Sequence, residues 1–195
     1  MENHQIKQQI LLLKPRLEAL KGCLHSLGFI FNPNDILPVP DSRNVEIIRR
    51  IEESVGEVPL ALKEFYREIG SINFNGYHPD WKGCEYPDAL IVFPAHCAEC
   101  ELEDFLSDTD KYIEAYGSFR IPIAPDFYHK QNVSGGMWYG IPIPYESPDP
   151  PLLEERHNTS FLNYLEIALH WGGFPGLENA GATHNWPLAA LREAR

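Results

Sequence analysis

Hydrophobic residues recur with regular spacing over the first 28 positions of the chain. The intervals alternate between four and three residues, and the positions are Ile6, Ile10, Leu13, Leu17, Leu20, Leu24 and Leu27. This spacing predicts a helix or helix pair with one apolar face. Pro15 predicts a kink or break, because its ring removes a hydrogen bond and clashes with the carbonyl of Leu11. The apolar face either packs on its own domain, which we favour, or forms a dimeric coiled coil. Gly28 is the expected stop.

Four later segments have the apolar spacing of a helix: 42–55, 59–70, about 98–116 and 160–171. Asp41 or Ser42 is the expected cap of the first. Pro59 suits the start of the second, because the first helical N–H has no intrahelical partner. The expected inward side chains are Val45, Ile48, Ile51, Val55, Leu62, Phe65, Tyr66, Ile69, Leu102, Phe105, Leu106, Ile113, Phe161, Leu162, Leu165, Ala168 and Leu169.

Strands are expected between these helices. A short strand is predicted near 72–74 and a buried one at 89–93, where the sequence reads ALIVF. Segments 120–128 and 136–145 predict an antiparallel pair whose prolines favour a sheet edge. Grouped helices and strands are typical of an α+β fold with an antiparallel sheet flanked by helices. We divide the chain into an N-terminal helical extension with a Pro-rich connector (1–41), an α+β domain (42–178) and a C-terminal tail packed on that domain (179–195).

The chain carries a net charge of −12 and has a pI near 5.0. This charge argues against nucleic acid and anionic membrane as partners and favours a basic protein. The competing interpretation is that the acidity only maintains solubility. The N-terminus has no signal-peptide pattern, and four cysteines are too few for a disulfide scaffold, so we expect a cytoplasmic protein.

No nucleotide-binding, hydrolase or metalloprotease motif is present, and we expect a protein that is not an enzyme and has no cofactor. Cys84, Cys97, Cys100 and His96 are candidates for a metal site, because Zn²⁺ prefers four such ligands. The pair Cys97 and Cys100 is alternatively a redox pair, or all three are plain buried thiols, which we favour. With 28 carboxylates in the chain, we expect any close pair of them to be a solvated surface feature.

Two kinds of side chain are candidates for a partner-binding face. Carboxylates are dense from 99 to 110, although an acidic helix face is usually only solvated. Aromatic residues in loops and proline-broken strands anchor interfaces when they are exposed, but they are equally ordinary residues at the rim of a core. The predicted face consists of Trp81, Tyr86, Glu99, Glu101, Glu103, Asp104, Trp138 and Tyr139.

Residues 51–81 resemble the start of the SUKH superfamily, which includes killer-toxin-resistance regulators and bacterial immunity proteins. The matching positions are Ile51, Gly56, Val58, Pro59, Leu62, Phe65, Tyr66, Gly70, Gly76 and Trp81. Later matches are the run 121–124 with Asp126, the strand GGMWYGIPI and the helix SFLNYLEIAL. The resemblance covers about 42–175. The chain departs from the family in having Ile69-Gly70 where Asn-Gly is common, and in its long N-terminal extension.

The resemblance implies an α+β domain without catalytic residues that neutralises a cognate toxin, often a nuclease, by binding it. We therefore expect an immunity-type protein that occludes a toxin or another basic protein. A regulatory scaffold, with a possible homodimer, is one alternative. A zinc-containing protein or metal-dependent enzyme that uses Cys84, Cys97 and Cys100 is the other.

Overall fold

The computed structural model describes residues 2–32 and 36–194, so residues 33–35 of the predicted connector lie outside the described residues. The helices are α1 (Glu2–Ser26), α2 (Asn44–Val55), α3 (Leu60–Glu68), α4 (Ala95–Ser107), α5 (Thr109–Tyr116), α6 (Phe161–His170) and α7 (Leu188–Glu193), with 3-10 turns η1 (His129–Gln131) and η2 (Pro175–Asn179). The strands are β1 (Ile30–Phe31), β2 (Ile72–Asn73), β3 (Gly76–Tyr77), β4 (Ile91–Val92), β5 (Phe119–Ala124) and β6 (Tyr139–Ile143).

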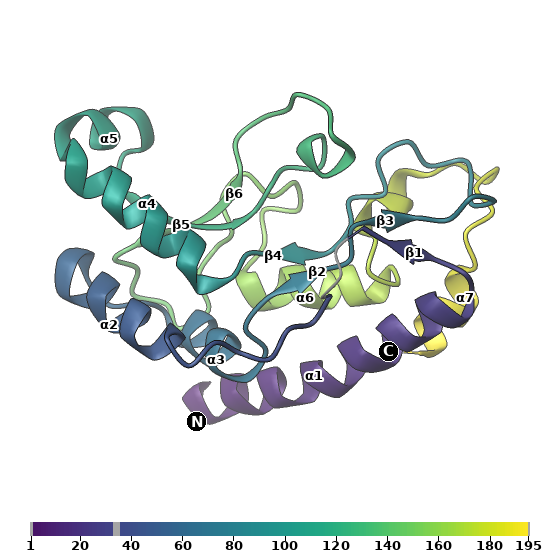
Figure 1. The fold of residues 1–195 in the computed structure, drawn as a ribbon, viewed down its shortest axis with the longest axis horizontal. Coiled ribbons are helices and arrows are strands. Elements are labelled where there is room, and N and C mark those ends of the chain that lie inside the picture. The colour runs from purple at the N-terminus through teal and green to yellow at the C-terminus, as the bar shows by residue number, and fades with distance from the viewer. Residues whose placement is uncertain (1, 33–35, 195) are drawn as a thin grey trace.

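The described strands form three antiparallel ladders, β1–β3, β2–β4 and β5–β6, and the helices surround them. Figure 1 shows α1 running along one side of the molecule, with α4 and α5 at one end and β1, β3 and α7 at the other. The predicted α+β class, with short antiparallel sheets flanked by helices, is therefore confirmed. None of the described helices is both long and apolar enough to cross a bilayer.

Helix α1 packs on its own domain through the predicted apolar face. Ile10, Leu20 and Leu24 are fully buried and belong to the same hydrophobic core as the later elements. Of the expected kink or break at Pro15, the break is wrong, because the helix is continuous from Glu2 to Ser26. Pro15 and Leu11 are both on the exposed side, where water can solvate the carbonyl that loses its donor. The coiled-coil alternative is also wrong for this face, which is already covered.

Helices α2 and α3 were predicted within two residues of their observed bounds. The buried face of α2 differs from the predicted one: Asn44, Ile47, Ile48 and Ile51 are buried, whereas Val45, which was predicted inside, is 67% exposed. Asn44 takes an inner position because its Nδ2 donates a hydrogen bond to the carbonyl of Tyr66 at 2.9 Å. Neither expected cap residue is the N-cap, which is Arg43, although Asp41 Oδ1 accepts a hydrogen bond from the Arg43 amide.

The helix predicted at about 98–116 is two helices, α4 and α5, separated by Asp108. Asp108 has non-helical dihedral angles, and its carboxylate caps α5 by accepting from the amide of Lys111 at 3.2 Å. Because α4 turns Ala95, Ala98 and Leu102 toward the core, Leu106 is left 51% exposed, and Ile113 of α5 is 40% exposed. The inward placement predicted for these last two side chains is wrong.

The pair β5–β6 is antiparallel, as predicted, with Ile121 opposite Ile141. The amide of Phe93 donates to the carbonyl of Ile123 at 2.7 Å and so connects the β4 segment to β5. Only Ile91 and Val92 of the predicted strand 89–93 form a ladder, although Ala89 and Leu90 are also buried. Helix α6 matches its prediction, with Phe161, Leu165 and Ala168 buried.

Candidate functional site

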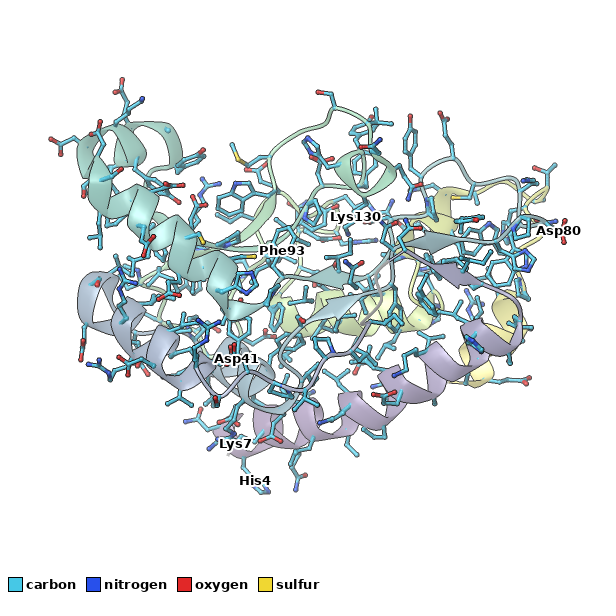
Figure 2. All side chains as sticks on the ribbon, viewed as in Figure 1. His4, Lys7, Asp41, Asp80, Phe93 and Lys130 are labelled. Atoms are coloured by element: carbon cyan, nitrogen blue, oxygen red, sulfur yellow. The ribbon has the colours of Figure 1, made fainter. Side chains whose placement is uncertain are left out.

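A buried ion pair lies near the centre of the molecule. Lys130 on η1 and Asp88 in the loop before β4 have fully buried side chains, and Nζ lies 2.6 Å from Oδ1. Figure 2 shows Lys130 inside the fold, whereas His4, Lys7 and Asp80 lie at its margin. Lys130 Nζ also lies 3.4 Å from the Tyr164 hydroxyl and 4.9 Å from the centre of the Tyr139 ring. Removing two charges from water costs free energy, and each charge offsets this cost only while its partner is present.

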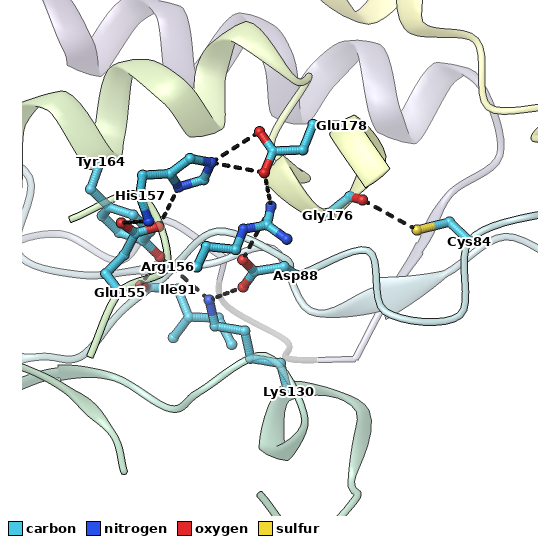
Figure 3. A network of polar contacts seen from close by, with 10 residues as sticks. All are labelled: Cys84, Asp88, Ile91, Lys130, Glu155, Arg156, His157, Tyr164, Gly176 and Glu178. Carbon is cyan, nitrogen blue, oxygen red and sulfur yellow. Dashed lines mark hydrogen bonds and ion pairs between the residues drawn. The ribbon is translucent and has the colours of Figure 1, made fainter. Parts of the chain in front are cut away.

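Four residues extend this pair into a network (Figure 3). Arg156 Nη2 lies 3.2 Å from Glu178 Oε1 and 3.9 Å from Asp88 Oδ2. His157 is placed between two carboxylates: Nδ1 contacts Glu155, and Nε2 lies 2.9 Å from both oxygens of Glu178. Burial lowers the pKa of His157, but its hydrogen bonds to Glu178 and Glu155 outweigh this effect and raise the pKa overall.

Strained backbone and unpaired polar atoms gather around the same network. Asp88, Glu154 and Asn158 have positive φ angles of 55°, 65° and 49°. Asp88 Oδ2 and Arg156 Nε are buried and have no hydrogen-bond partner among the described residues. Such strain and unpaired buried groups cost free energy and concentrate at functional sites. These features make the network a candidate site.

An open pocket of about 440 Å³ adjoins the network, and Arg156 forms part of its wall. Its size is within the range of small-molecule sites. The other residues around it come from the loop 83–86, from Phe127 and from the segment 176–181, and they are Gly83, Cys84, Glu85, Tyr86, Phe127, Gly176, Asn179, Ala180 and Gly181.

No pattern in the sequence predicts this network. Asp88 and Glu155 are buried, so the expectation that close carboxylates are solvated is wrong for them. Arg156 and His157 lie in an acidic, Pro-rich loop that has no motif. The four chain segments that meet here are separated by up to 90 residues, from Asp88 to Glu178, and only the tertiary fold joins them.

The structure does not assemble the candidate metal ligands. Among the described residues, no group of three or more histidine, cysteine or acidic side chains is placed to hold a metal ion. Cys97 and Cys100 share the first turns of α4, whereas Cys84 Sγ lies 3.7 Å from the carbonyl of Gly176 in η2. All four cysteines are free thiols, and burial raises the pKa of Cys97 and of Cys84.

The predicted acidic residues lie together on α4, and the structure divides them by partner. Glu99 and Glu103 pair with Arg50 of α2, at 2.9 and 3.3 Å. Glu101 accepts a hydrogen bond from the Tyr112 hydroxyl at 2.7 Å. Burial raises the pKa of Glu101, and this hydrogen bond opposes the shift. Asp104 is exposed and has no ion-pair partner among the described residues.

The four predicted aromatic residues are not on one surface. Tyr139 is 1% exposed and packs against Tyr164, so the prediction that it lies on a binding face is wrong. Trp81 stacks on His78 and contacts Trp186 in a cluster that covers the core near β1 and β3. Tyr86 contacts Phe127 at the pocket, and Trp138 packs near Tyr116 of α5. Trp138 is therefore the one that lies beside the acidic helices.

The chain matches no protein-family model, and no curated protein or solved structure is significantly similar to it. The resemblance of residues 51–81 to the SUKH superfamily stays a prediction from the sequence.

Proposed function

We propose that this chain is a non-enzymatic protein-binding domain of the immunity type, and that a basic protein docks on α4 and α5. The observation that carries this proposal is the surface of these two helices. They contain six carboxylate residues and one lysine, and Asp108 between them adds a seventh carboxylate, so this part of the chain holds a large share of the net charge of −12. A basic partner is attracted to such a surface, because opposite potentials steer the encounter.

Three carboxylates on this surface are free to receive a partner's cations. Asp104, Asp110 and Glu114 are exposed, and none has an ion-pair partner among the described residues. Glu99 and Glu103 already share Arg50, so they attract a ligand less strongly. The predicted acidic face is therefore displaced toward the junction of α4 and α5, and we call Asp104, Asp110 and Glu114 the acidic triad.

Two aliphatic side chains supply apolar contact area within the acidic surface. Leu106 and Ile113 are 51% and 40% exposed, although the spacing of the sequence predicted them inside. Apolar anchors surrounded by charged residues are typical of protein interfaces. In the proposed mechanism the partner's basic surface covers these side chains, and stoichiometric occlusion prevents that surface from meeting its own target.

The resemblance to immunity proteins supplies the expected class of partner, a toxin that is often a nuclease. Because a nuclease must attract a phosphate backbone, its active face is basic, and an acidic protein can compete for it. The toxin is proposed to be the product of a neighbouring gene.

The test is co-expression of the chain with that gene product, followed by growth assays and measurement of the Kd of the purified complex. The informative variant is the triple reversal Asp104→Lys, Asp110→Lys, Glu114→Lys. Its matched control reverses Asp80, Glu146 and Glu193, which are exposed, lie outside α4 and α5, and change the net charge equally. We expect the first variant to lose rescue and the control to retain it. Absence of a complex with the wild-type chain, or equal losses in both variants, contradicts the proposal.

A further inference from the structure

The pocket beside the buried network has an unsatisfied hydrogen-bond donor in its wall. Arg156 Nη2 is taken up by its ion pairs with Glu178 and Asp88, whereas Nε is buried without a hydrogen-bond partner and Nη1 makes no hydrogen bond among the described residues. In Figure 3 the guanidinium nitrogen without a drawn contact points to the side on which Cys84 and Gly176 lie. Both of these residues line the pocket. A ligand oxygen in the pocket would give Arg156 the acceptor that it lacks.

An aromatic surface forms another part of the wall. The rings of Tyr86 and Phe127 lie 6.0 Å apart in an edge-to-face arrangement, and Tyr128 packs against both. The neighbouring Glu85 carboxylate raises the pKa of the Tyr86 phenol by stabilising its protonated form. Aromatic rings favour offset or edge contacts with a flat ligand. The pocket therefore offers one donor and an aromatic surface.

The charges around the pocket favour a neutral ligand. The charge of Arg156 is already compensated by Glu178 and Asp88, so an anionic ligand finds no free cation there and meets the Glu85 carboxylate in the wall. A cationic ligand meets the guanidinium itself. The wall holds one cation, Arg156, and one carboxylate, Glu85, so it favours neither sign of ligand charge.

We propose that this pocket binds a neutral, flat ring that carries a carbonyl oxygen, the chemistry shared by aromatic amides and nucleobases. The carbonyl oxygen accepts a hydrogen bond from Arg156 Nη1, and the ring packs against Tyr86 and Phe127. Asp88, which has a positive φ angle, and Glu178 hold the guanidinium at 3.9 and 3.2 Å. This inference is independent of the docking surface on α4 and α5.

Three ligands of nearly equal shape test the proposal: benzamide is neutral with a carbonyl, benzoate is an anion and benzamidine is a cation. Titration followed by amide NMR shifts measures each Kd and locates each site. We expect benzamide to bind with a Kd on the order of 1 mM and to shift Cys84, Tyr86 and Gly181. Uracil serves as a second neutral arm, and binding of uracil in place of benzamide assigns the site to nucleobases.

Two variants of the full chain locate the site. Gly181 lines the pocket, and a Cβ there meets only Thr183 Oγ1 at 3.9 Å, so Gly181→Leu obstructs the pocket without a backbone clash. Its control is Gly22→Leu on α1, where a Cβ meets nothing within 4 Å. We expect benzamide binding to be lost in the first and unchanged in the second. Tyr86→Ala is expected to weaken it about fivefold.

The proposal is overturned if benzoate or benzamidine binds more tightly than both neutral ligands, or if no ligand shifts the pocket residues. It is also overturned if Gly22→Leu weakens binding as much as Gly181→Leu. Because none of these variants lies on α4 or α5, retained binding of the protein partner separates this outcome from the proposed function.

Discussion

At the scale of single residues, the dominant feature is the charge placed inside the fold. Lys130 and Asp88 are fully buried, and Tyr164 connects them to the backbone by donating from its hydroxyl to the carbonyl of Ile91 at 3.2 Å. A buried pair of this kind contributes little net stability, but loss of one partner leaves an uncompensated charge. Removal of either residue alone should therefore cost more stability than the intact pair contributes.

Substitution of one partner should reveal this dependence. We expect Lys130→Met to lower the free energy of unfolding by about 3–5 kcal/mol, because Asp88 is left buried and unpaired. The double variant Lys130→Met, Asp88→Asn should recover more than half of that loss, since no charge remains and asparagine tolerates positive φ. Urea denaturation measures both. A double variant as unstable as the single one would show that the charges are not the cause.

His157 gives the stability a dependence on pH. Its pKa in the folded state is raised above the ordinary value of 6.5, so its stabilising contribution is fully present below that value. The contribution is lost as the pH rises through the folded-state pKa. We expect the stability difference between wild type and His157→Gln to shrink with rising pH from about 6.5 upward. Urea denaturation at a series of pH values measures it, and a constant difference contradicts the assignment.

At the scale of elements, helix α1 contains a proline that the fold tolerates. The two halves of the helix are held by one buried stripe, and Arg16 forms a two-bond ion pair with Glu166 of α6 at 2.7 and 2.8 Å. The proline still removes an intrahelical hydrogen bond. Tertiary packing therefore outweighs a local preference in this helix.

Removal of this proline should stabilise the protein. We expect Pro15→Ala to raise the free energy of unfolding by about 1–3 kcal/mol, because an intrahelical hydrogen bond returns and the steric clash disappears. Gln8→Ala, at another exposed position of α1, is the control and should change it by less than about 0.5 kcal/mol. Thermal or urea denaturation measures both, and a destabilised Pro15→Ala variant would contradict the explanation.

The sequence predicted where the helices lie in the chain better than which of their side chains face the core. The apolar spacing located α2, α3 and α6, and all of the predicted inner residues of α6 are buried. It misplaced Val45, Leu106 and Ile113, because spacing identifies several apolar positions and packing decides which of them face the core. The sequence did not predict the break at Asp108, because an aspartate that caps a helix cannot be told from the other acidic residues of this segment.

At the scale of the whole molecule, segments distant in the sequence share one core. Leu20 of α1 and Leu191 of α7 are both fully buried in the same hydrophobic cluster. The network of Asp88, Lys130, Arg156 and Glu178 arises in the same way. No local pattern predicts such a site, because each residue alone is an ordinary charged side chain and only long-range packing brings them together.

The core role of α1 can be tested with two leucines of the same helix. Leu20 is fully buried, whereas Leu12 is 63% exposed. We expect Leu20→Ala to cost about 2–5 kcal/mol of stability and Leu12→Ala less than about 0.5 kcal/mol. Urea denaturation compares them. Equal effects would mean that the apolar face of α1 is not part of the core in solution.

The proposed docking of a basic protein on α4 and α5 should be visible in hydrogen exchange. Exchange of the chain alone is compared with exchange in complex with the neighbouring gene product, because binding slows exchange where the partner covers the surface. We expect the strongest new protection between residues 95 and 116, centred on the acidic triad. New protection confined to other segments, with residues 95–116 exchanging as in the free chain, would contradict the claim.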